Sequence, residues 1–215
     1  MRISERAERI EPFWVMEVAK AASQKAREVA HTDRPVVFLN IGEPDFTAPS
    51  RVQQAAQTAI QSGQTQYTPA LGVDALRQAI SNWYAQRFGV QVPASRIVVT
   101  AGASAALQLA CLALIDRGDE ILMPDPSYPC NRHFVSAAEG TAVLLPTTAQ
   151  ERFQLSAAKV AAAWGPHTRG VLLASPSNPT GTSIDPAELA RIVEVVRSRG
   201  AVSYTHLTLP TILRV

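Results

Sequence analysis

The spacing of apolar positions divides the chain into two kinds of segment. In the first part, apolar side chains recur every three or four residues, as they do on one face of an α-helix. The stretch from Trp14 to Val29 has this pattern, and Gly63 and Gly89 stand where helices commonly end. The sequence therefore predicts three early helices, over residues 14–30, 50–62 and 73–88.

Short aliphatic runs between helical stretches dominate from residue 97 onward. Strands that alternate with helices build right-handed βαβ units with parallel strands, so the predicted fold class is α/β with a mainly parallel sheet. The expected strands are residues 36–39, 97–100, 120–123, 141–145 and 171–173, with a further strand beginning at Ala201 and Val202. The helices expected between them end near Ile115, Ala138, Trp164 and Arg199.

The last of these helices has a recognisable start. Asp185 is a capping residue type, Pro186 suits the first helical position, and Glu188 stands three residues after the cap. This spacing predicts a capping box, in which the glutamate reaches back to the cap.

Composition narrows the class of partner. The 215 residues are 47% apolar with a net charge of +2, and there is no basic stripe of the kind that binds nucleic acid. No run approaches the ~20 apolar residues that span a bilayer, and residues 1–11 do not resemble a secretory signal. Cys111 and Cys130 have no paired spacing and indicate reduced thiols in a cytoplasmic protein. The four scattered histidines give no metal signature.

The turn at Gly102 joins a predicted strand to a helix. The backbone N–H groups of Ala103 and Ser104 would lie at the helix N-terminus, where an anion is favoured, and the Ser104 hydroxyl could join them. Alternatively, Ser104 only caps its own helix. The turn matches neither the Walker loop nor the dinucleotide fingerprint, so a phosphate monoester fits it better than a nucleotide.

Two further turns follow predicted strands of the same sheet. Tyr128 could cover a planar ligand, or it could simply pack beneath a loop. Asn178 could donate to a ligand oxygen, or it could simply form a turn. Because open α/β sheets bind ligands at the carboxyl ends of their strands, these groups together describe a site for a flat phosphorylated aromatic molecule.

Five blocks make the chain similar to a known family. Their order and spacing resemble the class I/II aminotransferases, which are pyridoxal-phosphate enzymes of fold type I with a three-layer α/β/α large domain. The blocks are residues 41–46, 67–72, 100–107, 124–129 and 177–181.

The resemblance implies a role for each cofactor-side residue. Gly102, Ala103 and Ser104 would bind the phosphate of pyridoxal 5′-phosphate. The ring of Tyr128 would stack on the pyridine, and Asn178 would donate to its phenolic oxygen and lie beside the substrate.

The resemblance also implies substrate and subunit contacts. Gly42 would contact the carboxylate of an amino acid or 2-oxo acid through its backbone. Tyr67 would reach the phosphate bound by the partner subunit, which implies a homodimer. The segment with Ile10, Pro12 and Phe13 is similar to the one that covers the active-site mouth.

The family's catalytic groups have no counterpart here. The family holds the cofactor as a Schiff base to a lysine and keeps its pyridine nitrogen protonated with an acid on the strand after the helix at Asp185. No Asp or Glu follows Glu194. The lysines are Lys20, Lys25 and Lys159, all on predicted helices that we expect to lie away from the sheet edge. We therefore expect no catalytic residue in this chain and an inactive fragment.

Residues 202–211 depart from the family pattern. They resemble the translation of a transposase-type sequencing adapter, although a natural divergent C-terminus is the alternative. The expected layout is an N-terminal arm and helix over 1–35 that belong to the small domain and active-site cover, a partial cofactor-binding large domain over 36–201, and a non-native tail over 202–215. A sheet cut short exposes an edge and apolar helix faces, so we expect poor solubility.

Aminotransfer from an amino acid to a 2-oxo acid is the leading function. Another fold-type I pyridoxal-phosphate enzyme, such as a C–S β-lyase, shares nearly all of these blocks. A non-catalytic ligand-binding protein on the same scaffold is the alternative from a different class.

Overall fold

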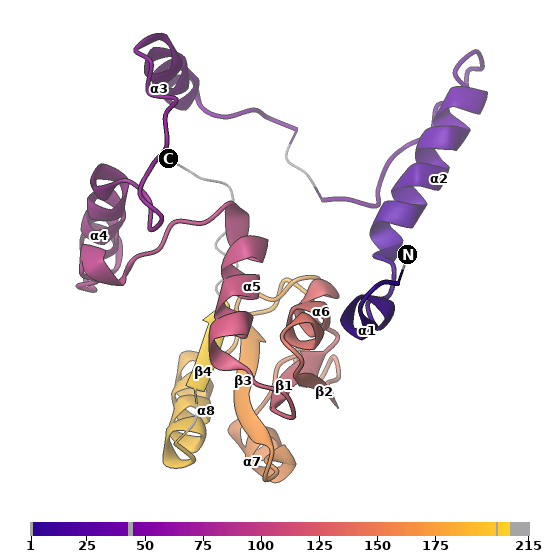
Figure 1. The fold of residues 1–215 in the computed structure, drawn as a ribbon. Coiled ribbons are helices and arrows are strands. Elements are labelled where there is room, and N and C mark those ends of the chain that lie inside the picture. The colour runs from indigo at the N-terminus through magenta and orange to yellow at the C-terminus, as the bar shows by residue number, and fades with distance from the viewer. Residues whose placement is uncertain (1, 43–44, 201, 207–215) are drawn as a thin grey trace. The chain divides into compact units, whose positions relative to one another are not determined.

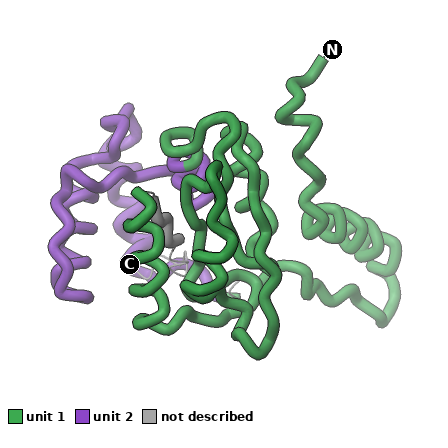
Figure 2. Tube along the Cα trace, turned by 90° about the horizontal axis from the view of Figure 1, so that it is seen from below, with its two compact units in different colours: residues 1–45, 111–209 green, residues 46–110, 210–215 purple. Residues whose placement is uncertain are grey.

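The computed structural model describes residues 2–42, 45–200 and 202–206, the last five by their backbone alone. The described residues fall into two compact units (Figure 2). The first unit comprises the chain up to Asp45 and from Cys111 onward, and the second comprises Phe46–Ala110. Each unit is described by itself.

The early helices are where the apolar spacing predicts them. The first unit begins with α1 (Glu5–Glu8) and α2 (Trp14–Glu28). The second unit holds α3 (Ser50–Gln61), α4 (Asp74–Phe88), the short 3-10 helix η1 (Ala94–Arg96) and the start of α5 (Gly102–Leu114). Helix α1 and the 3-10 helix η1 were not expected, because four and three residues are too few to show a period.

The first unit is built on a parallel sheet (Figure 1). Its strands are β1 (Glu120–Asp125), β2 (Thr141–Pro146), β3 (Thr168–Ala174) and β4 (Val202–His206), in the order β2-β1-β3-β4. The connecting helices are α6 (Cys130–Ala137), α7 (Ala157–Ala163) and α8 (Pro186–Ser198). All strand pairs are parallel, which confirms the predicted α/β class.

Two expected strands are not strands. Residues 36–39 pair with no other described segment, and Val37 and Leu39 are 74% and 89% exposed. Residues 97–100 are extended but form no ladder with another described strand. Apart from bonds to the turns directly before and after them, Val99 N donates to Leu71 O at 3.0 Å. A β-branched run becomes a strand only when a neighbour supplies ladder partners, which neither run has within the described residues.

Strand β4 occupies the place expected for the strand after α8. Its backbone pairs with β3 from Gly170 opposite Val202 to Ala174 opposite His206. Ladder hydrogen bonds use backbone groups that any non-proline residue supplies, so the pairing is compatible with either origin of the tail. Residues 207–215 lie outside the described part of the chain.

The core of the first unit lies between the sheet and two helices. Right-handed crossovers place α6 on one face, because the chain moves from β1 outward to β2, and α7 and α8 on the other, because it then moves back through β3 to β4. The buried cluster on the α7 and α8 face consists of Leu122, Leu155, Val160, Val171, Leu173, Ile184, Ile192 and Val196.

The start of α8 confirms one part of its sequence prediction and corrects another. Asp185 caps the helix, because its Oδ1 accepts from the N–H groups of Ala187 (2.9 Å) and Glu188 (3.2 Å). The predicted capping box is wrong. Glu188 does not reach back to its own cap; its Oε1 accepts from Ala157 N at 2.6 Å, at the first residue of α7. The glutamate therefore ties two helix N-termini together.

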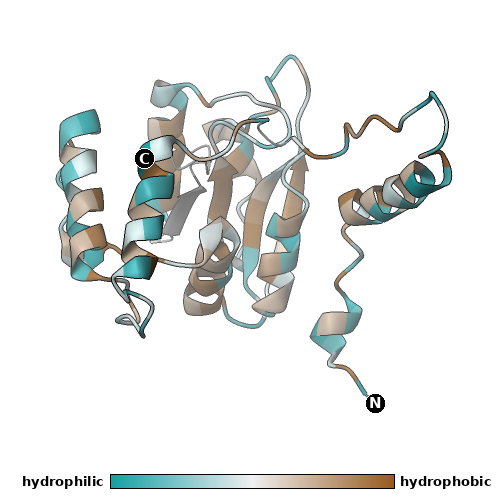
Figure 3. Ribbon diagram, turned by 90° about the horizontal axis from the view of Figure 1, so that it is seen from above, coloured by the Kyte–Doolittle hydropathy of each residue, from teal (hydrophilic) through white to brown (hydrophobic). Residues whose placement is uncertain are grey.

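The helices α1–α4 differ from the later ones in burial. None of them contains a buried residue, although brown and teal faces alternate around them much as they do around the helices of the sheet unit (Figure 3). Their apolar faces are therefore open to water in this chain, which is the condition for the poor solubility that we expect. No helix among the described residues is both long and apolar enough to cross a membrane.

Replacement of Ile192 tests the assigned core. Its side chain is 0% exposed, so Ile192→Ala removes buried methyl groups and leaves a cavity, and we expect a loss of about 2–5 kcal/mol in the free energy of unfolding. Glu194→Ala, on the exposed side of the same helix, should change it by less than about 0.5 kcal/mol. Denaturant titration of both variants measures the difference, and equal losses would contradict the core assignment.

Candidate functional site

The order of the strands singles out one point on the sheet. The chain leaves β1 toward β2 on one side and later returns to β3 on the other, so the direction of winding reverses between β1 and β3. Ligands of open α/β sheets bind outside the carboxyl ends of the strands at such a switch point. Tyr128 follows the end of β1 by three residues, and Asn178 follows the end of β3 by four. The two predicted residues therefore flank the expected binding edge.

Tyr128 is half-buried and has two described neighbours. Its ring and that of Phe13 form a T-shaped pair with a centroid distance of 6.2 Å and an interplanar angle of 82°. A hydrogen bond with the Cys130 thiol, together with burial, raises the pKa of Tyr128 to about 12. The N-terminal segment that we expect to cover the site thus contacts the ring that we expect to stack on the cofactor.

The loop after β3 closes on itself through backbone bonds. Ser177 N donates to Thr182 O at 2.8 Å, and Gly181 N donates to Ser177 O at 2.7 Å. Gly181 has a φ of +68°, a conformation that glycine adopts without strain. At the base of the loop, Ile184 N donates to the Ser175 hydroxyl at 3.0 Å.

Asn178 lies at the exposed part of this closed loop. Its neighbour Ser177 is only 5% exposed, and the Ser177 hydroxyl has no partner among the described residues. No hydrogen bond of the Asn178 side chain is found in the described part of the chain, and the residue is exposed. The loop therefore fixes the backbone around Asn178 and leaves its amide free to bind.

A buried glutamine holds the same loop from outside. Gln154, which follows β2 by eight residues, donates from Nε2 to Thr182 O at 2.8 Å and lies 3.1 Å from Thr182 Oγ1. The two residues before it, Arg152 and Phe153, have φ values of 54° and 53°. Such left-handed conformations are strained for residues other than glycine.

The predicted phosphate site lies in the second unit. Helix α5 begins at Gly102, whose φ is +85°, and an added Cβ there would meet no atom within 4 Å. Ser104 therefore stands two residues inside the helix instead of at its cap, and its exposed hydroxyl makes no hydrogen bond within the described residues. The alternative that Ser104 only caps α5 does not fit this position.

The remaining predicted residues are exposed. Gly42 is exposed in the first unit, and the neighbouring Glu43 and Pro44 of its sequence block lie outside the described residues. Tyr67 is fully exposed in the second unit. Tyr128, Asn178 and the covering segment thus belong to the first unit, in which Phe13 contacts Tyr128, while Tyr67 and the Gly102 turn belong to the second.

All three lysines have acidic partners. Lys20 Nζ lies 2.6 Å from Glu17, and Lys25 Nζ lies 3.2 Å from Glu28. The expectation that Lys159 lies away from the sheet edge is wrong. Its Nζ donates at 2.7 Å to Pro146 O, the last carbonyl of β2, and at 2.7 Å to Glu151. The sequence placed its helix correctly but could not show how far the four-carbon side chain reaches.

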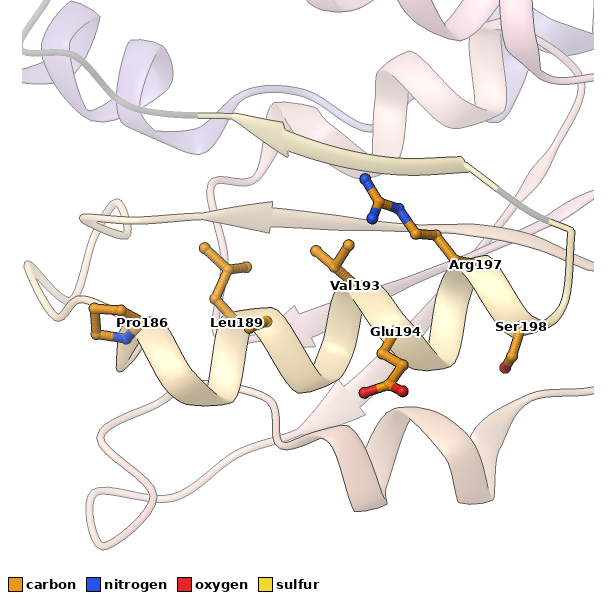
Figure 4. A pocket seen from close by; sticks show the side chains of 7 residues that line it. Pro186, Leu189, Val193, Glu194, Arg197 and Ser198 are labelled. Atoms are coloured by element: carbon orange, nitrogen blue, oxygen red, sulfur yellow. The ribbon is translucent and has the colours of Figure 1, made fainter. Parts of the chain in front are cut away.

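An open groove of about 790 Å³ runs along α8 (Figure 4). Leu189, Val193 and Arg197 project from one side of the helix toward β4, whereas Glu194 projects from the opposite side. No predicted site residue lines this groove, so it belongs to the flank of the unit and not to the strand-end site.

Three residues near the site were not singled out by the sequence. Cys130 contributes most to the raised pKa of Tyr128, and Gln154 donates to Thr182 in the loop. The thiol stands two residues from the tyrosine and could have been suspected. Gln154 is 28 residues from Thr182, and no local pattern announces a contact over that distance.

Known proteins match most of this chain. Residues 34–205 match the family model of class I and II aminotransferases. A valine–pyruvate aminotransferase of Mycobacterium tuberculosis is 43% identical over 183 residues, which are 85% of this chain and 46% of that protein. An aspartate aminotransferase of Rhizobium meliloti is 37% identical over 190 residues, 88% of this chain and 46% of that protein. The chain spans about half the length of the curated relatives it matches.

Solved structures give the same result. A crystal structure of an aminotransferase from Mycobacterium tuberculosis superposes with a TM-score of 0.87 at 40% identity, covering 95% of this chain and 51% of that one. An aspartate aminotransferase from Thermus thermophilus with maleate superposes with a TM-score of 0.87 at 29% identity, covering 96% of this chain and 53% of that one.

Replacement of Cys130 tests the environment of Tyr128. The raised pKa means that folding favours the protonated phenol, so this contribution to stability is complete below pH ~10, the ordinary tyrosine value, and is lost as the pH rises to about 12. Cys130→Ala removes the largest cause and should lower the pKa of Tyr128 toward ~10.

Tyrosinate absorbance after rapid pH jumps measures this shift, and the difference from Tyr128→Phe isolates one of the four tyrosines. Cys111→Ala, at the other free cysteine, is the matched control and should leave the titration of Tyr128 unchanged. An unchanged titration in Cys130→Ala would show that the thiol does not bond the phenol.

Proposed function

Because the chain belongs to the class I and II aminotransferase family, we propose that the complete protein transfers an amino group from an amino acid to a 2-oxo acid with pyridoxal 5′-phosphate as cofactor. The observation that carries the proposal is the position of Tyr128 and Asn178. They flank the switch point between β1 and β3, where sheets of this kind bind ligands.

The residues present fit the cofactor. The exposed hydroxyl of Ser104 and the first N–H groups of α5 are free to bind a phosphate, and the open space at Gly102 leaves room for it. Pyridoxal phosphate, when bound, supplies an electron sink for the charge that develops at the substrate Cα. In our proposal Gly102, Ala103 and Ser104 bind the phosphate.

The first unit would orient the ring. Tyr128 would stack on one face of it, and the Phe13 ring packs against the tyrosine from the N-terminal segment. The free amide of Asn178 donates to the phenolic oxygen and borders the substrate. Closure of the covering segment that contains Phe13 would exclude water from the same place.

The substrate and subunit contacts remain proposals as well. Gly42 would bind the substrate carboxylate through its backbone, and Tyr67, which is fully exposed here, would reach the phosphate of a partner subunit in a homodimer. We further propose residues 1–35 as the arm and cover, residues 36–201 as part of the large domain, and residues 202–215 as a non-native tail.

We propose that the 215-residue chain does not transaminate by itself. Each of its lysines is held by a carboxylate, and Lys159 is additionally bonded to a strand-end carbonyl. No contact among the described residues places any of the three beside Tyr128 or Asn178, so none is positioned for a specific imine. The acid expected to face the pyridine nitrogen also has no counterpart after Glu194.

Borohydride trapping tests this proposal. We expect no stoichiometric covalent adduct of pyridoxal phosphate at Lys20, Lys25 or Lys159 when the chain is incubated with the cofactor, reduced and mapped by peptide mass spectrometry. Free lysine amines mixed with the cofactor at the same concentration provide the positive control. A stoichiometric adduct at one of the three lysines would overturn the proposal.

The complete protein tests the family activity. We expect amino transfer from a donor panel of valine, aspartate and alanine to 2-oxo acids, and an Asn178→Ala variant should bind the cofactor about tenfold more weakly, the loss of roughly one hydrogen bond. Release of pyruvate from a C–S substrate without a 2-oxo acid acceptor would indicate a β-lyase instead. Cofactor binding without turnover of either kind would indicate a ligand-binding protein.

A further inference from the structure

We propose that Gln154 is a positioning residue, which holds the loop Ser175–Ile184 so that Asn178 meets the cofactor. The inference rests on the proposed function for the role of Asn178. It concerns a side chain that lies in a different part of the sequence and that none of the family's sequence blocks contains.

Two hydrogen bonds close the loop, one at its base between Ile184 N and the Ser175 hydroxyl and one nearer its tip. In the second, the N–H of Ser177 donates to the carbonyl of Thr182, and Asn178 lies between these two residues. The only other backbone bond described within this turn, from Gly181 to Ser177, lies inside the same closure. Any displacement of Thr182 therefore carries the segment that presents Asn178 with it.

Gln154 binds at this point of closure. Its Nε2 donates to Thr182 O, the oxygen that also accepts from Ser177, and it lies within bonding distance of Thr182 Oγ1. The Thr182 hydroxyl in turn lies 2.9 Å from the Thr180 hydroxyl. One buried amide, 8% exposed, thus fixes both the backbone and the side chain of the residue that closes the loop.

The backbone that carries Gln154 is itself held in place by its neighbours. Phe153 N donates to Thr148 O at 2.9 Å and Gln154 N donates to Glu151 O at 3.1 Å, so a tight turn precedes it. Leu155, directly after it, is buried in the core. The left-handed backbone at Arg152 and Phe153 persists because these contacts over-determine it. This enforced backbone directly precedes Gln154, which fits a role of the turn in directing its side chain toward Thr182.

Amide hydrogen exchange measures the hold of Gln154 on the loop. Gln154→Met keeps the length of the side chain and removes its donors. We expect exchange at the amides of Ser177, Gly181 and Ile184 to accelerate about tenfold, the equivalent of about one hydrogen bond. Gln150→Met is the matched control, because Gln150 is exposed in the same turn and has no hydrogen bond within the described residues. It should leave these rates unchanged.

A pH-dependent rescue separates the hydrogen bond from simple packing. Gln154→Glu is isosteric, but its carboxylate cannot donate. Exchange in this variant, corrected for the intrinsic rate, should be fast at neutral pH and should return toward that of the parent chain once acid protonates the carboxyl group and restores a donor. The Met variant should show no such return. A purely space-filling role would give no rescue in either variant.

Equilibrium dialysis of the 215-residue chain with pyridoxal 5′-phosphate tests the link to the cofactor. Affinity about tenfold lower in Gln154→Met and unchanged in Gln150→Met supports the proposal. Unchanged loop exchange in Gln154→Met overturns it, and so does a loosened loop with unchanged affinity. If the 215-residue chain binds no pyridoxal phosphate, the same comparison of Gln154→Met with Gln150→Met is made on the complete protein, where equal affinities overturn the proposal. Far-ultraviolet circular dichroism verifies that each variant is folded.

Discussion

Parallel pairing of β1 with β3 is the constraint on which the candidate site depends. The two strands are neighbours in space, with Leu122 opposite Val171, although β2 lies between them in the sequence. The pairing brings the segments after both strands to one edge and reverses the winding there. Without it, Tyr128 and Asn178 would be two unrelated turn residues. The location of the candidate site is thus set by the order of the strands, and the side chains determine only what can bind there.

The spacing of apolar residues was sufficient to predict most of the helices and strands of this fold. The helices from α2 to α8 and the strands β1 to β3 lie where apolar spacing, caps and glycine stops predict them. The failures at residues 36–39 and 97–100 have one cause: β-branched composition reports a preference that only a paired neighbour can realise. The sequence correctly placed Glu188 in the first turn of α8 but predicted the wrong partner for its carboxylate. A glutamate that completes a capping box and one that bonds to another helix stand in the same local sequence.

The candidate site divides in the same way. Tyr128, Asn178 and the turn at Gly102 could be found from the sequence, since each directly follows an extended segment at a recognisable turn. The contacts that hold these groups could not. The sequence named Phe13 as part of a covering segment but not as the partner of Tyr128, and it gave no sign that Gln154, between β2 and α7, reaches Thr182. The candidate ligand-binding residues lie in short recognisable sequence motifs. The residues that position them are distant in the sequence and belong to no such motif.

The bond from Ala157 to Glu188 has a consequence for how this unit opens. Helix N-termini fray first because their N–H groups lack partners, yet here a carboxylate of α8, which also pairs with Arg191, accepts from the first N–H group of α7. Opening of the first turn of α8 therefore removes the partner of the α7 N-terminus. The two helices and the core between them should consequently open as one cooperative element. The turn that leads into α8 should then open only when both helices do, and so less often than an ordinary surface loop.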